Sequence, residues 1–346
     1  MLKIALDVMG GDYAPHYPVE GAVLALHEYP KLHVVFVGQE TIVNRELAKF
    51  PNAPKERIEI VHAEEVIGME EAPGVALRRK KQSSIRVGLD LVKNKQADAF
   101  ISAGNTGAVM GGSLLYLKTM PGVAKAAIAT FLPTIAGTSI MLDVGANVDC
   151  RPEHILQFAL MGNSYAKYVL GIAEPKVGVL SIGEEDGKGN DSTRQTFTLL
   201  SDCPLINFYG NVEGKEVYKG GCDVIVCDGF VGNIALKVSE SLAGMISTML
   251  KEELSRGFLN RLGALLAMGG LKNLKKRVDY TEYGGAPLLG VTGPVFICHG
   301  NSNPNAMKNA FRAASIYVEK QVNQHISDDI VQTLSKLKQH IPQVNE

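Results

Sequence analysis

The chain has 346 residues, of which 35 are Lys or Arg and 36 are Asp or Glu, so its formal net charge is −1. This length suits one large domain or two closely joined ones, and the near-neutral charge gives no general electrostatic basis for binding nucleic acid. The five cysteines are odd in number and include no C-x-x-C pair, which argues against a disulfide framework and favours a reducing, cytoplasmic location. The first residues lack the organisation of a signal peptide, and no apolar stretch approaches the roughly 20 residues of a membrane span.

Short apolar runs alternate along the chain with longer amphipathic stretches, and this alternation predicts an α/β fold with a mainly parallel sheet. Two segments, 126–134 and 138–145, are separated by a short Ile-Ala-Gly link and predict an antiparallel pair, which makes the sheet mixed. Helical patterns occur at 18–29 and 151–171. The other predicted strands are 3–9, 33–38, 58–63, 98–104, 176–183, 223–229 and 294–300.

One region departs from this alternation. Residues from about Ser239 to Tyr283 predict two consecutive helices without a strand between them. We therefore expect a helical hairpin, residues 239–283, that projects from a single catalytic α/β unit spanning residues 1–346.

Loops rich in Gly, Asn and Asp follow most of the predicted strands. They read DVMGGDYAP, SAGNTGA, DVGANVDC, SIGEEDGKGN, FYGNVEG, CDGFVGN and CHGNSN. Gly and Asn also build ordinary turns, but ligands of open α/β sheets bind beyond the carboxyl ends of the strands. Seven such loops in one chain are therefore expected to converge on one cleft.

The motifs of several enzyme classes are absent from the sequence. It has no G-x-S-x-G, no H-E-x-x-H or close Cys/His set, and no G-x-G-x-x-G that opens a helix after a strand. No metal and no cofactor is therefore expected. His299 follows a strand, where it either faces the cleft or hydrogen-bonds a neighbouring loop. The cysteines lie mostly in apolar strands, where thiols behave as small hydrophobes, and Cys150 is the best candidate for a nucleophile among them.

The loop GEEDGKGN, residues 183–190, contains Lys188 but does not match the P-loop pattern. Lysine supplies a point charge that suits phosphate, glycine lets backbone amides approach an anion, and asparagine donates to a developing oxyanion. These residue types position and stabilise a reactant but supply no covalent nucleophile. We therefore expect the substrate itself to be the nucleophile, and inorganic phosphate fits that role.

The loops closely resemble, in sequence and in order, those of the PlsX family of phosphate acyltransferases. The resemblance runs from Leu6 to beyond Asn305 and includes ALDVMGGDYAP, LSIGEEDGKGN, DVIVCDGFVGN and PLLGVTGPVFICHGNS. It implies transfer of a fatty acyl group from acyl carrier protein to inorganic phosphate. It also implies an α/β/α sandwich like those of isocitrate dehydrogenase and phosphotransacetylase, a homodimer, and a product that passes to a membrane glycerol-3-phosphate acyltransferase in phospholipid synthesis.

The resemblance implies that Lys188 and Asn233 form the catalytic pair. Asn233 would donate to the tetrahedral oxyanion or to phosphate, and we expect Lys188, Asn190 and nearby loop amides to hold the phosphate. Asn105 and Thr106 begin a predicted helix whose N-terminus favours an anion. The other predicted phosphate- or substrate-binding residues are Gly10, Gly11, Asn147, Gly232 and His299.

Acidic residues in these loops would repel phosphate if they faced it. Asp7, Asp12 and Asp149 are therefore expected to organise loop amides, with metal binding as the alternative. Glu184 and Glu185 would also repel phosphate if they faced it, and they are expected to maintain the structure of their loop.

The predicted hairpin carries basic residues and no acidic residue between Ser255 and Val278. A basic, apolar helix can lie in the interface of an anionic membrane. The alternative is a dimer interface, and the same basic residues could instead dock acidic carrier protein. The predicted membrane contacts are Phe258, Leu262, Leu265, Leu266, Lys272 and Lys275.

Three other functions remain open from the residues alone. A short-chain phosphotransacetylase that uses coenzyme A would perform almost the same chemistry, and the sequence does not determine the acyl chain length. A metal-dependent β-decarboxylating dehydrogenase would need a nucleotide fingerprint and a metal cluster. A membrane-attached scaffold for lipid enzymes would not need so many glycine and asparagine loops.

Overall fold

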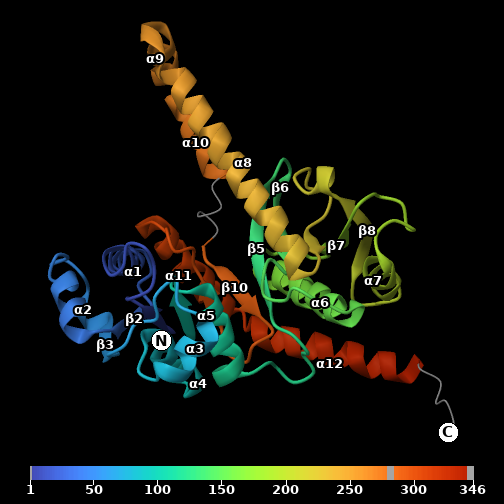
Figure 1. The fold of residues 1–346 in the computed structure, drawn as a ribbon, viewed down its shortest axis with the longest axis horizontal. Coiled ribbons are helices and arrows are strands. Elements are labelled where there is room, and N and C mark those ends of the chain that lie inside the picture. Colours follow the sequence, from blue (N-terminus) through green and yellow to red (C-terminus); the bar gives the residue numbers. More distant parts are fainter. Residues whose placement is uncertain (1, 279–283, 341–346) are drawn as a thin grey trace.

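The computed structural model describes residues 2–278 and 284–340, and its centre is one mixed sheet of eleven strands (Figure 1). The strand order across the sheet is β3-β2-β1-β4-β11-β10-β5-β6-β9-β7-β8. The strands are β1 (Leu2–Asp7), β2 (Leu32–Gly38), β3 (Ile58–His62), β4 (Ala99–Ser102), β5 (Ala127–Thr134), β6 (Gly137–Leu142), β7 (Lys176–Ser181), β8 (Asn207–Glu213), β9 (Val224–Val226), β10 (Ala286–Leu289) and β11 (Val295–Ile297).

The sheet consists of two half-sheets that run in opposite directions. Strands β1 to β4 and β11 are parallel to one another, and β6 to β9 are parallel to one another. Strands β5 and β6 form the predicted antiparallel pair, which confirms the mixed sheet. Strand β10 joins the halves, because Ala286 and Pro287 pair with β11 whereas Leu288 and Leu289 pair with β5. The two halves are therefore staggered along the strand direction.

Helices cover both faces of the sheet, because the strands are apolar on both sides. Along β1, Ile4 and Leu6 face one core and Ala5 faces the other. Helices α1, α6, α11 and α12 contribute to the first core, and α3, α4 and α5 to the second. The predicted three-layer α/β/α architecture is thus confirmed. The helices of the body are α1 (His16–Glu28), α2 (Glu40–Leu47), α3 (Pro73–Arg79), α4 (Ser84–Lys93), α5 (Thr106–Gly112), α6 (Pro152–Tyr168), α7 (Asp191–Ser201), α11 (Pro304–Glu319) and α12 (Val322–His340), with short helical turns η1 (Lys55–Arg57), η2 (Ser113–Leu117) and η3 (Gly214–Glu216).

A helical arm extends away from the body (Figure 1). It consists of α8 (Gly229–Ser255), α9 (Gly257–Leu266) and α10 (Met268–Val278). The sequence predicts two helices from about Ser239, whereas α8 begins ten residues earlier, and the segment after it is divided between two further helices. Asp228 caps α8 by accepting a hydrogen bond from the Val231 amide at 2.8 Å. The last predicted hairpin residues, 279–283, lie outside the described residues.

Candidate active site

The stagger of the two half-sheets brings the carboxyl ends of strands from both halves to one cavity of about 380 Å³. Thr106 follows β4, and His299 follows β11. From the other half, Gly145 follows β6, and Asn233 lies in the first turns of α8 after β9. These residues therefore meet although their strands run in opposite directions. A larger, more open cavity of about 550 Å³ lies beside Lys3 at the start of β1, and no predicted site residue lines it.

The lining of the smaller cavity is part apolar and part polar. The apolar side chains come from β5, β10, β11, α8, α11 and the loop after β6, and most polar groups lie on α8 and on the loops after β4 and β11. Such a lining can hold an apolar chain next to a charged or polar head. The residues are Thr106, Ile128, Thr130, Phe131, Val144, Gly145, Asn233, Leu236, Lys237, Glu240, Gly284, Gly285, Ala286, Ile297, Cys298, His299, Ser302 and Ala306.

Asn233 presents its amide to this cavity. It is exposed, and within residues 2–278 and 284–340 its side chain has no hydrogen-bond partner. Gly145 lies beside it: a Cβ on Gly145 would lie 3.6 Å from Cγ of Asn233. Gly145 also has φ +140°, a conformation that favours glycine. A free amide donor at this position can stabilise an oxyanion.

Gly232 holds the first turn of α8 against the loop after β6. A Cβ at this position would lie 1.9 Å from the carbonyl oxygen of Asp143. The amide of Gly229 donates to the Asn147 carbonyl at 2.7 Å, which fixes the same two segments together. Gly232 is buried and does not line the cavity, so its role in the structure is close packing behind Asn233.

Asp143 organises the loop after β6, a role that the sequence predicts for Asp149. The buried Asp143 carboxylate accepts hydrogen bonds at 3.0–3.1 Å from the amides of Ile128, Gly145 and Ala146 and at 2.7–2.9 Å from the Asn147 amide and side chain. Burial raises the pKa of Asp143 despite these bonds.

This finding corrects two predictions. Asp149 is exposed and contributes its backbone carbonyl, which accepts from Lys125 Nζ at 2.7 Å. Asn147, predicted to bind substrate, donates through its side chain to Asp143 and to the Ala126 carbonyl, so its amide group is used inside the loop.

Asp7 accepts hydrogen bonds that organise the loop after β1, as Asp143 does after β6, and the sequence predicts this role for Asp7. Its Oδ1 accepts from the Met9 amide at 3.0 Å, and its Oδ2 accepts from Ser102 Oγ at 2.7 Å. Burial raises the pKa of Asp7 as well. Both aspartates stand in the tripeptide LDV at the end of a strand, and this recurrence is a sequence signal that could have identified Asp143.

The predicted substrate-binding glycines Gly10 and Gly11 hold neighbouring loops together. A Cβ on Gly10 would lie 2.6 Å from the amide nitrogen of Gly104, and a Cβ on Gly11 would lie 3.1 Å from the Gly300 carbonyl. The Asp12 amide donates to that same carbonyl at 2.8 Å, and the Asp12 side chain is exposed. The loops after β1, β4 and β11 thus form one packed group.

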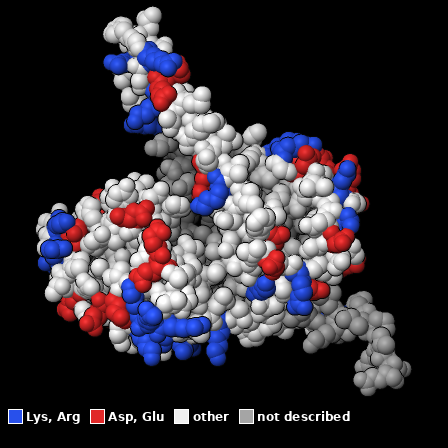
Figure 2. Space-filling view, viewed as in Figure 1, with Lys and Arg blue, Asp and Glu red and all other residues white. Residues whose placement is uncertain are grey.

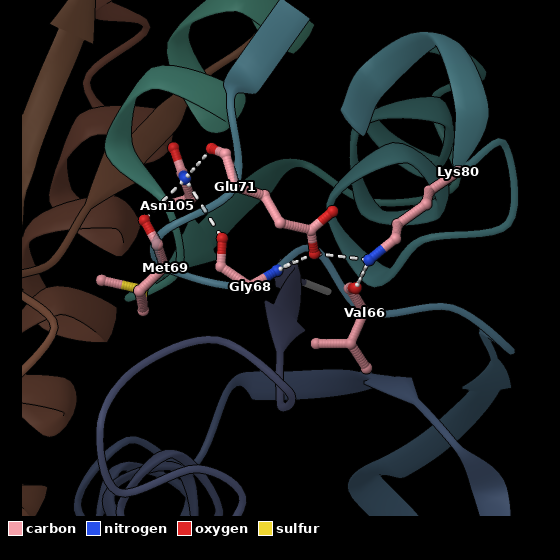
Figure 3. A network of polar contacts seen from close by, with 6 residues as sticks. All are labelled: Val66, Gly68, Met69, Glu71, Lys80 and Asn105. Carbon is pink, nitrogen blue, oxygen red and sulfur yellow. Dashed lines mark hydrogen bonds and ion pairs between the residues drawn. The ribbon is translucent and has the colours of Figure 1, made fainter. Parts of the chain in front are cut away.

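Asn105 is a structural clamp (Figure 3). Its Nδ2 donates to the carbonyls of Gly68, Met69 and Glu71 at 3.0–3.2 Å, and its Oδ1 accepts from the Ala108 amide at 3.0 Å. Both ends of the amide are therefore used inside the protein, which leaves no free group for the predicted contact with phosphate. The next residue, Thr106, is exposed and lines the cavity.

Lys188 lies on the loop between β7 and α7 and does not line the cavity. It is exposed, and its stem crosses the loop so that Cγ lies 3.0 Å from the point where a Cβ on Gly183 would sit. Its Nζ has no partner among the described residues. The loop follows the carboxyl end of β7, and α8 begins after the carboxyl end of β9. Because β7 and β9 are adjacent in the sheet, the two segments begin at neighbouring strand ends.

Two acidic residues of this loop make contacts within the protein, Glu184 through its carboxylate and Glu185 through its backbone carbonyl. Glu184 pairs with Lys215 at 3.0 Å, and the Glu185 carbonyl accepts from Asn211 Nδ2 at 2.7 Å and from the Lys188 amide at 2.9 Å. Asn190, predicted to help hold phosphate, caps α7 by accepting from the Thr193 amide and hydroxyl at 2.9 and 3.0 Å.

Lys237 is a cavity residue that was not predicted from the sequence. It lies one helical turn after Asn233 on the same face of α8, and it pairs with Glu240 at 3.1 Å. The i,i+4 spacing from Asn233 is the signal that could have identified it. His299 also lines the cavity and is exposed, and the Asn301 amide donates to its Nδ1 over a long 3.5 Å.

The cysteines are poor nucleophiles in this structure. Cys150 is half-buried, and burial raises its pKa to about 11. Cys298 lines the cavity but is buried, and burial raises its pKa to about 12. At neutral pH both remain thiols rather than thiolates. No group of three or more His, Cys, Asp or Glu side chains that could hold a metal ion occurs among the residues that the structure describes.

The outer part of the arm exposes apolar side chains. Phe258, Leu265 and Leu266 are 79%, 60% and 82% exposed, and Leu262 and Lys272 are exposed too. Lys275 lies in α10, but its side chain is outside the part of the chain that the structure describes. Within the described ranges, every helix is too short or too polar to cross a bilayer.

Comparisons of the sequence show which known proteins the chain is similar to. Residues 2–325 match a family described as "Fatty acid synthesis protein". The chain is 50% identical to the phosphate acyltransferase of Citrifermentans bemidjiense over 95% of this chain and 93% of that protein. It is 47% identical to the phosphate acyltransferase of Geobacter sulfurreducens over 100% and 99% of the two chains.

Solved structures show the same fold at low identity. A phosphotransacetylase from Streptococcus pyogenes superposes with a TM-score of 0.61 and 16% identity, covering 93% of this chain and 94% of that one. The phosphotransacetylase EutD from Staphylococcus aureus superposes with a TM-score of 0.58 and 17% identity, covering 91% and 94%.

Proposed function

The chain belongs to the PlsX family of phosphate acyltransferases, and from this membership we propose that it transfers a fatty acyl group from acyl carrier protein to inorganic phosphate. The cavity between the half-sheets supports this reaction, because it joins an apolar lining to polar groups around Asn233. The acyl phosphate would then enter phospholipid synthesis through a membrane glycerol-3-phosphate acyltransferase.

We propose direct attack of phosphate on the thioester. A phosphate oxygen bonds to the carbonyl carbon, the tetrahedral oxyanion forms, and its collapse breaks the carbon–sulfur bond. The proton of hydrogen phosphate ends on the departing carrier thiol, so the reaction balances without a cofactor. The unpartnered amide of Asn233 is the observation that carries this proposal, because it can donate to the oxyanion as charge develops.

The cysteines support the same mechanism, because raised pKa values leave Cys150 and Cys298 protonated and unreactive at neutral pH. A thiolate leaves readily, so positioning of the two reactants supplies much of the acceleration. Phosphate therefore needs charge balance and orientation more than it needs a strong general base.

Two lysines could supply that charge. Lys237 lies in the cavity beside Asn233, although Glu240 neutralises part of its effect. Lys188 has a free ammonium group, and its loop follows β7, the strand next to β9, after which α8 begins. We propose that Lys188 holds the attacking phosphate and that Glu184, turned toward Lys215, leaves it free to do so.

We also propose that α8 and the tip of the arm have different partners. The exposed apolar stripe of α8 suits a second copy of the chain, and it includes Val238, Leu242, Met245 and Met249. The tip, with Phe258 and the leucines of α9 beside basic residues, suits an anionic membrane surface. Contact with the membrane would release a reactive, amphiphilic product where it is consumed.

The function is tested by mass spectrometry after mixing protein, phosphate and a fatty acyl thioester of either acyl carrier protein or coenzyme A. We expect acyl phosphate, formed with higher kcat/KM from the carrier thioester. We expect Lys188→Ala to form almost none while it remains folded. Acyl phosphate from coenzyme A thioesters alone would favour a short-chain phosphotransacetylase, and no product from any donor would favour a scaffold.

A further inference from the structure

A basic surface lies on helix α3 and the residues directly after it, outside the cavity. Arg78, Arg79 and Lys81 are exposed, and none of the three has an acidic partner within the described residues. Lys80 differs, because it pairs with Glu71 at 2.5 Å and donates to the Val66 carbonyl at 2.6 Å (Figure 3). Figure 2 shows a group of Lys and Arg side chains at the lower edge of the molecule, over the region of α3 and α4.

Exposed apolar side chains flank these charges. Val75 on α3 is 51% exposed, and Leu115 on η2 is 58% exposed. The two segments are held together, because Tyr116 Oη donates to the Leu77 carbonyl at 3.4 Å and the Leu77 side chain packs against Gly111. Apolar and basic groups on a fixed pair of helical segments form a surface that fits an acidic, amphipathic partner.

This surface is linked to the cavity by a packing contact at the start of α3. Pro73, the first residue of α3, lies against Gly107, where a Cβ would be 2.6 Å from Pro73 Cγ. Gly107 follows Thr106, which lines the cavity. Seven residues of helix span roughly 10 Å, so a protein on α3 would sit within reach of the cavity mouth. A group carried on a flexible arm could therefore enter while its carrier stays outside.

We propose that α3 and η2 form the docking surface for the acidic carrier protein that delivers the acyl thioester, an inference that rests on the proposed function. The basic residues of the arm are less suited to this role. Arg256 pairs with Glu253 at 2.6 Å, and it lies beyond the end of a 27-residue helix, roughly 40 Å long, that begins near the cavity. Charge complementarity on α3 steers the carrier to the cavity side of the molecule.

The test reverses three charges in the variant R78E/R79E/K81E. We expect kcat/KM for the carrier thioester to fall roughly 10-fold or more, through KM, and to lose most of its salt dependence. The kcat/KM for an acyl-CoA or acyl-pantetheine donor should remain unchanged, and calorimetric titration with carrier protein should show the same loss of binding. The matched control K31E/R45E/K55E reverses three exposed charges at α2 and the starts of β2 and β3 and should retain carrier kinetics.

Unchanged carrier binding and kinetics in R78E/R79E/K81E would overturn the docking surface while leaving the proposed function intact. An equal loss of kcat/KM with the carrier thioester and with acyl-CoA or acyl-pantetheine would also overturn the docking surface, because the substitutions would then act on the cavity. Loss of sedimentation with anionic vesicles, without any change toward the carrier, would assign the surface to the membrane instead. If the wild type makes no acyl phosphate from either donor, the proposed function fails, and the calorimetric titration alone decides the docking surface.

Discussion

The carbonyl oxygen of Asp143 occupies the space that a side chain on Gly232 would need, because it lies 1.9 Å from the position of a Cβ there. The contact joins the loop after β6 to the first turn of α8, one residue before Asn233. The obstacle is backbone, which is itself held by the hydrogen bonds of the Asp143 carboxylate. The position of Asn233 in the cavity therefore depends on a glycine that does not line it.

We expect Gly232→Ala to lower the free energy of unfolding by about 1–3 kcal/mol, as overpacking does, and to lower acyl phosphate formation. Gly244→Ala is the control on the same helix, since nothing lies within 4 Å of its Cβ position. It should instead raise stability by about 0.5–1 kcal/mol, because alanine favours helix more than glycine. Urea unfolding and the acyl phosphate assay measure both effects, and equal behaviour of the two variants would refute the packing role.

Asn233→Ala should lower kcat by about 10²–10³ and leave KM for the acyl donor nearly unchanged, as expected for a donor used mainly in the transition state. Its stability should not fall, because the side chain is exposed and unpartnered and alanine favours helix more than asparagine. Steady-state kinetics and thermal unfolding provide the two readouts, with Lys251→Ala, exposed farther along α8, as the control. A rise in KM with kcat preserved would show that Asn233 only binds substrate.

Alkylation of Cys150 should depend strongly on pH. With a pKa of about 11, its thiolate population rises only as the pH approaches 11. At pH 8 it should be roughly 10² times smaller than that of a free thiol of pKa about 8.5. Iodoacetamide labelling followed by peptide mapping measures this rate, and Cys150→Ser should retain activity. Rapid labelling near pH 7 with parallel loss of activity would indicate a nucleophilic cysteine.

The tip of the arm should determine membrane contact. The variant L265E/L266E should lose sedimentation with anionic vesicles and retain turnover of soluble substrates, because both side chains are exposed far from the cavity. Val331→Glu, at a 52% exposed position on α12, controls for the general loss of apolar surface and should sediment like wild type. Wild-type protein that stays in the supernatant would disprove the membrane role of the tip.

The sequence predicted most of the sheet, because its buried strands are continuous apolar runs. It missed β8 and β10 for physical reasons. Strand β8 lies at the edge of the sheet, and Gly210, with φ +109°, interrupts its pattern. Strand β10 has only four residues and contains Pro287, which cannot donate to a strand ladder. Its role of joining two staggered half-sheets is a tertiary property without a local signal.

The site was predicted in part. Four of the seven predicted loops line one cavity, and Asn233, Thr106 and His299 lie in it as expected from strand ends. The loops DVMGGDYAP, SIGEEDGKGN and FYGNVEG contribute no residue to its lining. The sequence does not show which polar groups form hydrogen bonds within the protein. Asn105 and Asn147 were therefore predicted to bind substrate, although the side-chain amides of both donate to backbone carbonyls. The roles of buried carboxylates such as Asp143 depend on which amides the fold brings within reach.

Direct attack of phosphate on the thioester is tested most directly by omitting phosphate. When excess carrier thioester is mixed with the protein alone, direct attack predicts no rapid release of carrier thiol and no acylated protein by intact mass spectrometry. Addition of phosphate should then start thiol release together with an equal amount of acyl phosphate. A burst of thiol equal to the amount of protein, with a matching acyl adduct on the chain, would contradict direct attack and establish a covalent intermediate.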